Sequence, residues 1–336
     1  MTTTIESKSR DALRAANRVI IKAGTSIVAN SNGQPSLTRL GAIVEQISEL
    51  VHNGTEVIFV SSGAVGMGKK LLRKQGRLNL SVKQLHTAQE NSNSQQTFGR
   101  KMDDHLVEPI SLSTSSSLSN LVTIDVDEEK LASAENQKQY DSACAAAGQF
   151  ELMNFYSSLF SQCDLTASQI LVTQADFQDK FRLKNLRYAV ERLLSLGIIP
   201  IVNENDAVSA ASGYRALQTF SDNDSLASIC ARSFGAEVLV ILTDVNGVYD
   251  KPPSAPDAKL IKFYPSDCGA IEIGEKSAQG RGGMGAKIDA ARDAVKPDTG
   301  SKCTACIIVG GHDLDCIRHV LGPNEEGIPD QQKGTL

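Results

Sequence analysis

The sequence contains no tryptophan, and only 5% of its 336 residues are aromatic. It also has no long apolar run: stretches such as residues 238–242 are far shorter than the roughly 20 residues that span a membrane. The first residues are polar and lack the apolar core of a secretory signal. The seven cysteines are scattered and odd in number, which indicates reduced thiols. We therefore expect a cytoplasmic protein with no membrane partner.

Positive charge is not in excess either. The 34 Lys and Arg residues face 39 Asp and Glu, for a net charge of −5. Nucleic-acid binding depends on clustered cations that displace counterions, so we expect no nucleic-acid partner. The composition is typical of a globular protein with a sizeable core, with 41% hydrophobic and 22% charged residues.

Short β-branched runs alternate with longer amphipathic stretches along the chain. Helices are predicted over residues 40–51, 185–196 and 225–234, the first with apolar residues at the spacing of one helix face. Strands that are apolar on both faces and alternate with helices indicate an α/β fold, in which helices cover a parallel or mostly parallel sheet. The predicted strands are residues 18–22, 56–61, 169–173, 198–203, 238–243 and 305–309.

Residues 87–139 interrupt this alternation. The segment is polar, and residues 111–119 (SLSTSSSLS) hold six serines and a threonine. Such a composition buries too little apolar surface to offset the entropy lost on ordering. We expect a disordered surface insertion here, and a regulatory loop phosphorylated on its serines is the alternative.

Small and polar residues follow four of the predicted strands. Ligands of open α/β sheets bind beyond the carboxyl ends of the strands, so these residues should share one rim. Lys22 is the most informative of them, because a lysine is a compact, mobile positive charge that can follow a phosphoryl group. The four strand ends are residues 22–26 (KAGTS), 61–64 (SSGA), 203–206 (NEND) and 243–244 (TD).

Residues 280–287 (GRGGMGAK) precede and open another predicted helix. Glycines before a helix N-terminus let backbone N–H groups approach an anion closely, and the helix dipole favours negative charge there. Arg281 and Lys287 add positive charge. The alternative is a flexible glycine-rich turn, but four glycines with two cations suit a phosphate better.

A third polar cluster, residues 222–224 (DND), stands directly before a predicted helix. Asp commonly caps a helix by accepting the free N–H groups of its first turn. Because one capping residue is enough, the other side chains are available to bind a ligand amino group or to hold lysines.

Two further patterns are weaker. Residues 63–69 fit the G-x-x-x-x-G-K of a P-loop, but Lys70 stands where a Ser or Thr should bind Mg²⁺. A zinc-like spacing also fails, because Cys306 begins an apolar strand on which residues three apart face opposite ways. We therefore expect no metal site, and cysteines that are buried in the core. The zinc-like set is Cys303, Cys306, His312 and Cys316.

In this order, and at strand ends, the motifs resemble the glutamate 5-kinase branch of the amino acid kinase family. The resemblance implies a three-layer α/β/α sandwich with an open, mostly parallel sheet, as one domain over residues 1–336. A lobe of about residues 15–210 would bind glutamate, and a lobe of about residues 211–336 would bind ATP. Unlike many bacterial members, the chain is expected to have no C-terminal RNA-binding-like domain. The matching motifs are residues 22–26, 60–64 (VSSGA), 200–208 (PIVNENDAV), 222–224, 242–244 (LTD), 247–249 (GVY) and 282–287 (GGMGAK).

The same resemblance implies roles for individual residues. Lys22 and Lys287 would be the catalytic cations beside the transferred phosphoryl group, and Asp224 would organise them. Glutamate would be bound by Ser62, Gly63, Asp206 and Asn223. The nucleotide would be bound by Lys22, Gly24, Thr243, Asp244, Gly282, Gly283, Met284, Gly285, Ala286 and Lys287.

The reaction implied is phosphorylation of the γ-carboxylate of L-glutamate by ATP with Mg²⁺, giving γ-glutamyl 5-phosphate in the first step of proline biosynthesis. A homo-oligomer, dimeric or tetrameric, and a γ-glutamyl phosphate reductase acting downstream are the implied partners. Two alternatives stay open. One is another amino acid kinase, such as an acetylglutamate kinase or an aspartokinase. The other is a non-catalytic nucleotide or amino-acid sensor, although a sensor would not need both lysines and Asp224.

Overall fold

The computed structural model describes residues 13–31, 33–75, 78, 134–209, 222–265, 283–296, 302–322, 332 and 334–336. The predicted insertion lies outside these residues except at its end, where helix α5 (Ala134–Ser161) begins before residue 139. The serine-rich residues 111–119 lie outside the described part of the chain.

Six parallel strands form one sheet at the centre of the molecule, in the order β3-β4-β2-β1-β5-β6. The α/β architecture and the parallel sheet predicted from the sequence are thereby confirmed. Strand β1 is central, and its Lys22 pairs with Val60 on one side and Ile241 on the other. The strands are β1 (Arg18–Ala23), β2 (Glu56–Ser61), β3 (Thr166–Val172), β4 (Ile198–Glu204), β5 (Val238–Thr243) and β6 (Ala305–Gly310).

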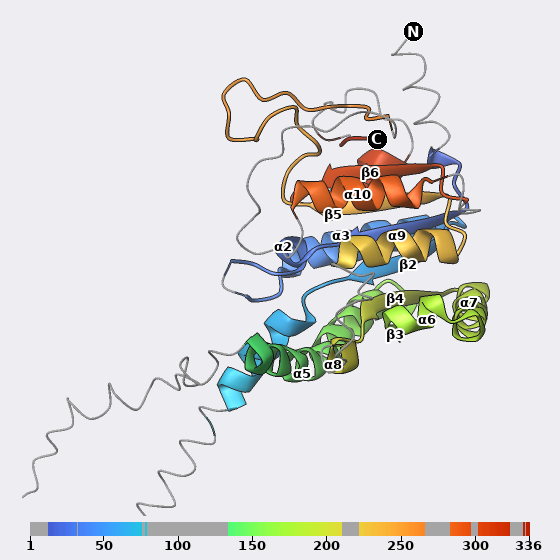
Figure 1. The fold of residues 1–336 in the computed structure, drawn as a ribbon. Coiled ribbons are helices and arrows are strands. Elements are labelled where there is room, and N and C mark those ends of the chain that lie inside the picture. Colours follow the sequence, from blue (N-terminus) through green and yellow to red (C-terminus); the bar gives the residue numbers. More distant parts are fainter. Residues whose placement is uncertain are drawn as a thin grey trace, which may run out of the picture.

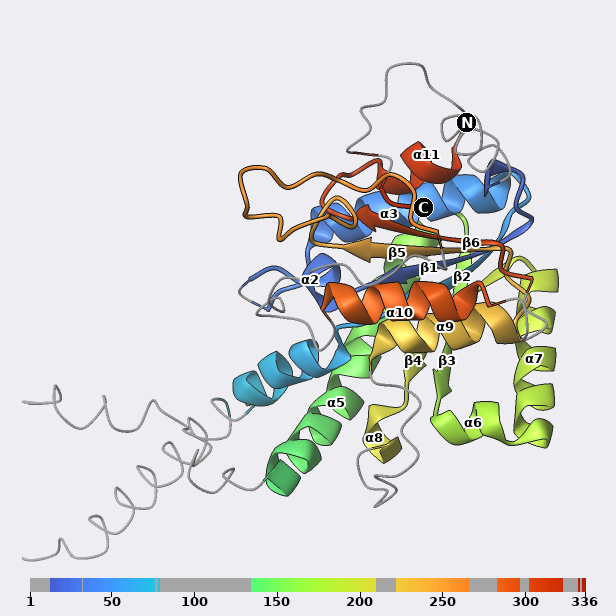
Figure 2. The same ribbon diagram turned by 45° about the horizontal axis from the view of Figure 1, so that its top comes forward.

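Helices cover both faces of this sheet and make three layers (Figures 1 and 2). One face is covered by α3 (Leu37–His52), α5 and α11 (Cys316–Leu321). The other is covered by α7 (Lys180–Ser195), α9 (Asn223–Ser233) and α10 (Met284–Ala294). Short helices at loops are α2 (Thr25–Val28), α6 (Gln174–Gln178) and α8 (Asp206–Ser209). Within the described residues, no helix combines the length and apolar character of a membrane span.

The strands are buried because each is apolar on both faces. Ile20 and Ile21 of β1 are both fully buried, and they belong to the hydrophobic clusters on opposite sides of the sheet. The exception is edge strand β3, whose residues are mostly exposed or half-buried. Both faces of a strand are covered only where neighbouring strands and helices surround it.

Helix boundaries follow capping residues more closely than apolar periodicity. The predicted helix over residues 185–196 begins at Lys180, because the Asp179 side chain accepts hydrogen bonds from the N–H groups of Phe181 and Arg182 at 2.8 and 2.9 Å. A capping side chain satisfies N–H groups that the first turn leaves without helical partners.

Helix α5 crosses the helical residues 64–75 at unusually short range. A Cβ added to Gly148 would lie 1.9 Å from the carbonyl oxygen of Ala64, and one added to Gly68 would lie 1.7 Å from that of Cys144. Only glycine permits backbones to approach so closely. This crossing holds α5 against the segment that follows β2.

The zinc-like set of the sequence is not brought together. Cys303 and Cys306 are buried in the core on one face of the sheet, whereas Cys316 is buried in the core on the other. Burial of these cysteines in the core, which the sequence predicts, is confirmed. Burial raises the pKa of the Cys303 thiol to about 11 and that of Cys316 to about 12.

Candidate functional site

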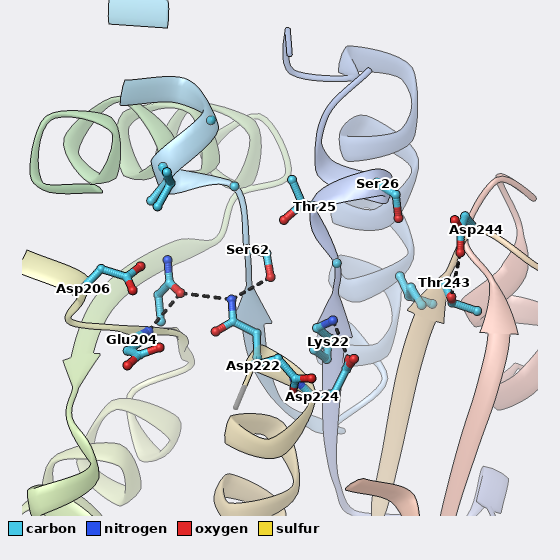
Figure 3. Close-up of a pocket in the computed structure, with 18 of the residues that line it drawn as sticks. Lys22, Thr25, Ser26, Ser62, Glu204, Asp206, Asp222, Asp224, Thr243 and Asp244 are labelled. Atoms are coloured by element: carbon cyan, nitrogen blue, oxygen red, sulfur yellow. Dashed lines mark hydrogen bonds and ion pairs between the residues drawn. The ribbon is translucent and has the colours of Figure 1, made fainter. Parts of the chain in front are cut away.

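A cavity of about 320 Å³ opens at the carboxyl ends of the central strands (Figure 3). Its walls include Lys22 from β1, Ser62 directly after β2, Glu204 at the end of β4, and Thr243 at the end of β5. In parallel sheets the strand ends share one rim, so residues far apart in the sequence meet there. The cavity lies at the rim of strand ends where the sequence predicts a site.

Three charged side chains meet at the floor of the cavity. The Nζ atom of Lys22 lies 2.5 Å from Oδ1 of Asp224, and the Nζ atom of Lys287 lies 3.1 Å from Oδ2 of the same carboxylate. Their side chains are only 5%, 3% and 12% exposed, for Lys22, Asp224 and Lys287 respectively. A carboxylate shared by two lysines from β1 and α10 fixes both cations at one point.

The surroundings lower the pKa values of both Lys22 and Asp224. Burial lowers the pKa of Lys22 and the charge of Lys287 lowers it further, while Asp224 opposes both effects. Burial alone would raise the pKa of Asp224, but the two lysine charges outweigh burial and leave that pKa below its ordinary value. Asp224 is therefore held as a carboxylate.

Asp222 caps helix α9 and turns the next two side chains toward the cavity. Its Oδ1 atom accepts hydrogen bonds from the backbone N–H groups of Asp224 and Ser225 at 3.1 and 2.9 Å. One residue of the cluster 222–224 thus serves as the cap, as the sequence suggests. All three residues line the cavity, and the side chains of Asn223 and Asp224 are not used for the cap.

Asn223 and Ser62, both predicted to bind substrate, are in direct contact. The Nδ2 atom of Asn223 donates to Oγ of Ser62 at 2.6 Å and to the carbonyl oxygen of Ser61 at 3.3 Å. Next along the chain, Gly63 has a φ of +110°, a left-handed conformation that favours glycine. Its Cβ would also lie 3.1 Å from the Val28 side chain, so a larger residue would be crowded as well as strained in this turn.

Two sides of the cavity differ in character. Glu204 and Asp206 lie on one side, near the end of β4, whereas Thr243 and Asp244 lie on the other, beyond Lys22 (Figure 3). Thr243 Oγ1 donates to Asp244 at 3.1 Å. Lys22 therefore stands between an acidic pocket, formed by Glu204 and Asp206, and a second polar pocket, formed by Thr243 and Asp244.

Most of the predicted site residues line this cavity, but residues 283–286 of the glycine-rich stretch do not. Of the described residues 283–287, only Lys287 lines it. Gly283 is the N-cap of α10, and Met284 packs against the hydrophobic core. Gly282 lies outside the described residues. Those that line the cavity are Lys22, Gly24, Ser62, Gly63, Asp206, Asn223, Asp224, Thr243, Asp244 and Lys287.

The structure also adds residues that were not predicted as site residues. Asn203 and Glu204 line the cavity, and the strand-end pattern at residues 203–206 already marked them as rim residues. Lys69 and Asp141 line it as well and form an ion pair of 2.8 Å. No sequence signal pointed to Asp141, because it lies on α5 beyond the long polar segment.

These residues form a polar cavity with buried cations at the strand ends of a parallel α/β/α sandwich, and they identify a class of protein. Residues 17–308 match the model of the amino acid kinase family, and the chain belongs to this family.

Its relatives include Delta-1-pyrroline-5-carboxylate synthase 2 of Oryza sativa subsp. japonica, which is 37% identical over 322 residues. They also include glutamate 5-kinase of Caldanaerobacter subterraneus subsp. tengcongensis, 31% identical over 279 residues. These matches cover 93% and 82% of this chain. The chain spans only 36% of the length of the plant relative and 58% of that of the bacterial one.

Solved structures with the same fold include two of isopentenyl phosphate kinases. One is the product complex of the T. acidophilum enzyme, with a TM-score of 0.51 at 13% identity. The other has a TM-score of 0.52 at 15% identity. Both cover 95% of this chain and nearly all of their own. At this identity the likeness shows the fold alone.

Proposed function

We propose that this chain transfers the γ-phosphoryl group of ATP to the γ-carboxylate of L-glutamate, giving γ-glutamyl 5-phosphate as the first step of proline biosynthesis. The observation that carries the proposal is Asp224, paired with both Lys22 and Lys287 on the floor of the cavity. Two fixed cations at one point suit the place where two anionic substrates meet. The relatives named glutamate 5-kinase support the choice of acceptor.

The reaction needs alignment and charge neutralisation more than proton transfer. A carboxylate of glutamate is already ionised at pH 7, so no general base has to activate it. A carboxylate oxygen bonds to the γ-phosphorus as the bond from phosphorus to the bridging oxygen breaks, and ADP leaves. Lys22 and Lys287 would neutralise the charge spread over the phosphoryl oxygens during this transfer.

The acidic pocket gives free glutamate its orientation. We propose that Asp206 binds the α-ammonium group, and the neighbouring Glu204 adds negative charge on the same side. Ser62 and Asn223 would bind a carboxylate of the substrate between this pocket and the lysines. The γ-carboxylate would then point toward Lys22. N-acetylation would remove the ammonium charge that the acidic pocket fits.

ATP would occupy the opposite side. Thr243, Asp244 and the first turn of α10 would bind the nucleotide, with Gly24 beside the phosphates. In this arrangement one lobe would bind glutamate and the other would bind ATP. A Cβ on Gly24 would lie 3.2 Å from Nζ of Lys22, so glycine leaves this cation accessible.

Mg²⁺ would enter with the nucleotide. Within the described residues, no group of three or more His, Cys, Asp or Glu side chains is arranged to hold a metal ion. Mg²⁺ is commonly bound through one or two carboxylates together with substrate phosphates. Asp244, on the proposed nucleotide side of the cavity, is the carboxylate suited to this task, and the bound ion would offset phosphate charge.

The product is an acyl phosphate, a reactive mixed anhydride. We propose a γ-glutamyl phosphate reductase as the downstream partner that consumes it, and a homo-oligomer as the state of the enzyme. Gel filtration with light scattering tests the second point, because a dimer or tetramer would elute with two or four times the chain mass.

The deciding experiment follows ADP release with ATP, Mg²⁺ and one acceptor at a time. L-Glutamate should support turnover, and hydroxylamine should trap the acyl phosphate as a hydroxamate. Turnover with N-acetylglutamate or aspartate alone would assign a different acceptor within the family. ATP binding without ADP release on any acceptor would favour a non-catalytic sensor.

A further inference from the structure

A chain of hydrogen-bonded side chains leads from the protein interior to the cavity. It begins at Gln149 of α5, whose Oε1 atom accepts from Nδ2 of Asn203 at 2.9 Å. Asn203 Oδ1 accepts from Nδ2 of Asn223 at 3.4 Å, and Asn223 donates onward to Ser62. Gln149 and Asn203 are 8% and 2% exposed. Asn203 forms part of the cavity wall, whereas Gln149 stands behind that wall.

Backbone groups identify the oxygen end and the nitrogen end of both asparagine amides. The N–H group of Glu204 can only donate, and it donates to Oδ1 of Asn203 at 2.9 Å, so Nδ2 of Asn203 must face Gln149. The carbonyl group of Ser61 can only accept, and it accepts from Nδ2 of Asn223. The chain of hydrogen bonds therefore has one direction.

This direction determines what Ser62 offers to a ligand. Its Oγ atom accepts from Asn223 at 2.6 Å, which occupies one of its acceptor positions. A hydroxyl group has a single hydrogen to donate, and in this arrangement that hydrogen is directed away from Asn223. A carboxylate can only accept hydrogen bonds, so it matches a hydroxyl presented in this way.

We propose that Gln149 is a positioning residue for the substrate carboxylate: it holds Asn203, which with Asn223 leaves the Ser62 hydroxyl as a donor into the cavity. The role rests on the proposed glutamate kinase activity. Gln149 acts only through its neighbours, because it does not line the cavity itself.

A second observation indicates that stabilising the fold is not the main role of Gln149. Its Nε2 atom is buried, and no hydrogen-bond partner for it is found among the described residues. A buried donor without a partner costs folding free energy, so Gln149 contributes less to stability than an amide that is hydrogen-bonded at both ends. The glutamine is therefore explained by its one hydrogen bond to Asn203.

Gln46 of α3 offers a matched control. It is 2% exposed and lies outside the cavity walls, but it uses both ends of its amide. Its side chain donates to the carbonyl oxygens of Ala42 and Leu314 and accepts from the N–H groups of Ile317 and Arg318. It therefore binds α3 to the start of α11, which is a structural task.

The test compares Gln149→Met with Gln46→Met in steady-state kinetics and thermal unfolding. Gln149→Met should raise KM for glutamate about three- to tenfold, with kcat and KM for ATP nearly unchanged, because one net hydrogen bond is lost in positioning. Gln46→Met should lower the melting temperature more and leave KM for glutamate unchanged. Gln149→Asn shortens the side chain by one carbon and so moves the same amide oxygen away from Asn203. It should act like Gln149→Met, and it is used instead if Gln149→Met does not fold.

A double-mutant cycle identifies the route of the effect. In a Ser62→Ala background, Gln149→Met should change KM for glutamate less than about twofold, because the hydroxyl that it positions is gone. Equal increases in both backgrounds, or an unchanged KM in the single variants, would overturn the positioning role. If the wild-type protein did not phosphorylate glutamate, that result would instead refute the proposed function, and the role of Gln149 with it.

Discussion

The ammonium group of Lys22 lies 2.5 Å from the carboxylate of Asp224, and both side chains are almost completely buried. A buried charge is costly unless it is paired, and here one carboxylate is paired with two lysines. The cluster carries one more positive than negative charge. That surplus suits a site where phosphoryl oxygens bind, because an anionic ligand would complete the charge balance.

Removing either lysine is expected to impair catalysis far more than binding. In Lys22→Ala and Lys287→Ala, kcat should fall on the order of a hundredfold or more, with KM for glutamate changed only a fewfold, because the cations act mainly in the transition state. Steady-state kinetics with glutamate and ATP measures both constants.

Lys251 provides the control for these two variants. It forms an exposed ion pair with Asp257, and Lys251→Ala should change kcat less than about twofold. Near-normal kcat in both Lys22→Ala and Lys287→Ala would remove the catalytic assignment of the lysines.

Neutralising Asp224 should move the alkaline limit of activity. Burial places the pKa of Lys22 below its ordinary value of 10.5, and the Asp224 charge partly restores it. In Asp224→Asn that support is lost, so Lys22 loses its proton at lower pH and the alkaline limb of kcat shifts downward. The pH profile of kcat checks this, with Asp257→Asn as the control. An upward shift, or none, would show that Lys22 does not carry the titration.

The acidic pocket is expected to control affinity for glutamate alone. In Asp206→Asn, KM for glutamate should rise about tenfold or more, because a hydrogen bond between charged groups contributes about 1.5–3 kcal/mol. KM for ATP should stay the same, since Asp206 lies on the far side of Lys22 from Thr243 and Asp244 (Figure 3). Separate titrations of the two substrates measure this. A parallel rise in both KM values would contradict the placement of glutamate beside Asp206.

Much of the sheet and its rim could be predicted from the sequence for a simple physical reason. Strands buried on both faces leave continuous apolar runs, and β2 and β5 begin and end at the predicted residues 56–61 and 238–243. Because parallel strands end at one edge, the polar residues after each run had to converge there. Lys22 lies at this rim for that reason, and it meets Asp224 because the first turn of helix α9, which carries Asp224, reaches the same cavity.

Helix α5 was not predicted from the sequence, because its apolar residues do not recur along one face of the helix. Its buried face includes the polar residues Gln149 and Tyr156, whereas Phe150 is 68% exposed. Local periodicity carries no information about a buried amide whose partner, Asn203, comes from a strand elsewhere in the chain. Asp141, on the same helix, was missed for the same reason.

The close crossing of α5 and the helical residues 64–75, at Gly148 and Gly68, should contribute to the stability of the protein. In Gly148→Ala, a Cβ 1.9 Å from the carbonyl oxygen of Ala64 would push the helices apart and lower the free energy of unfolding by about 1–3 kcal/mol or more. Gly41→Ala is the control, because nothing lies within 4 Å of its Cβ on helix α3. That variant should gain about 0.4–1 kcal/mol. Urea unfolding measures both, and equal stability of the two variants would contradict the close crossing.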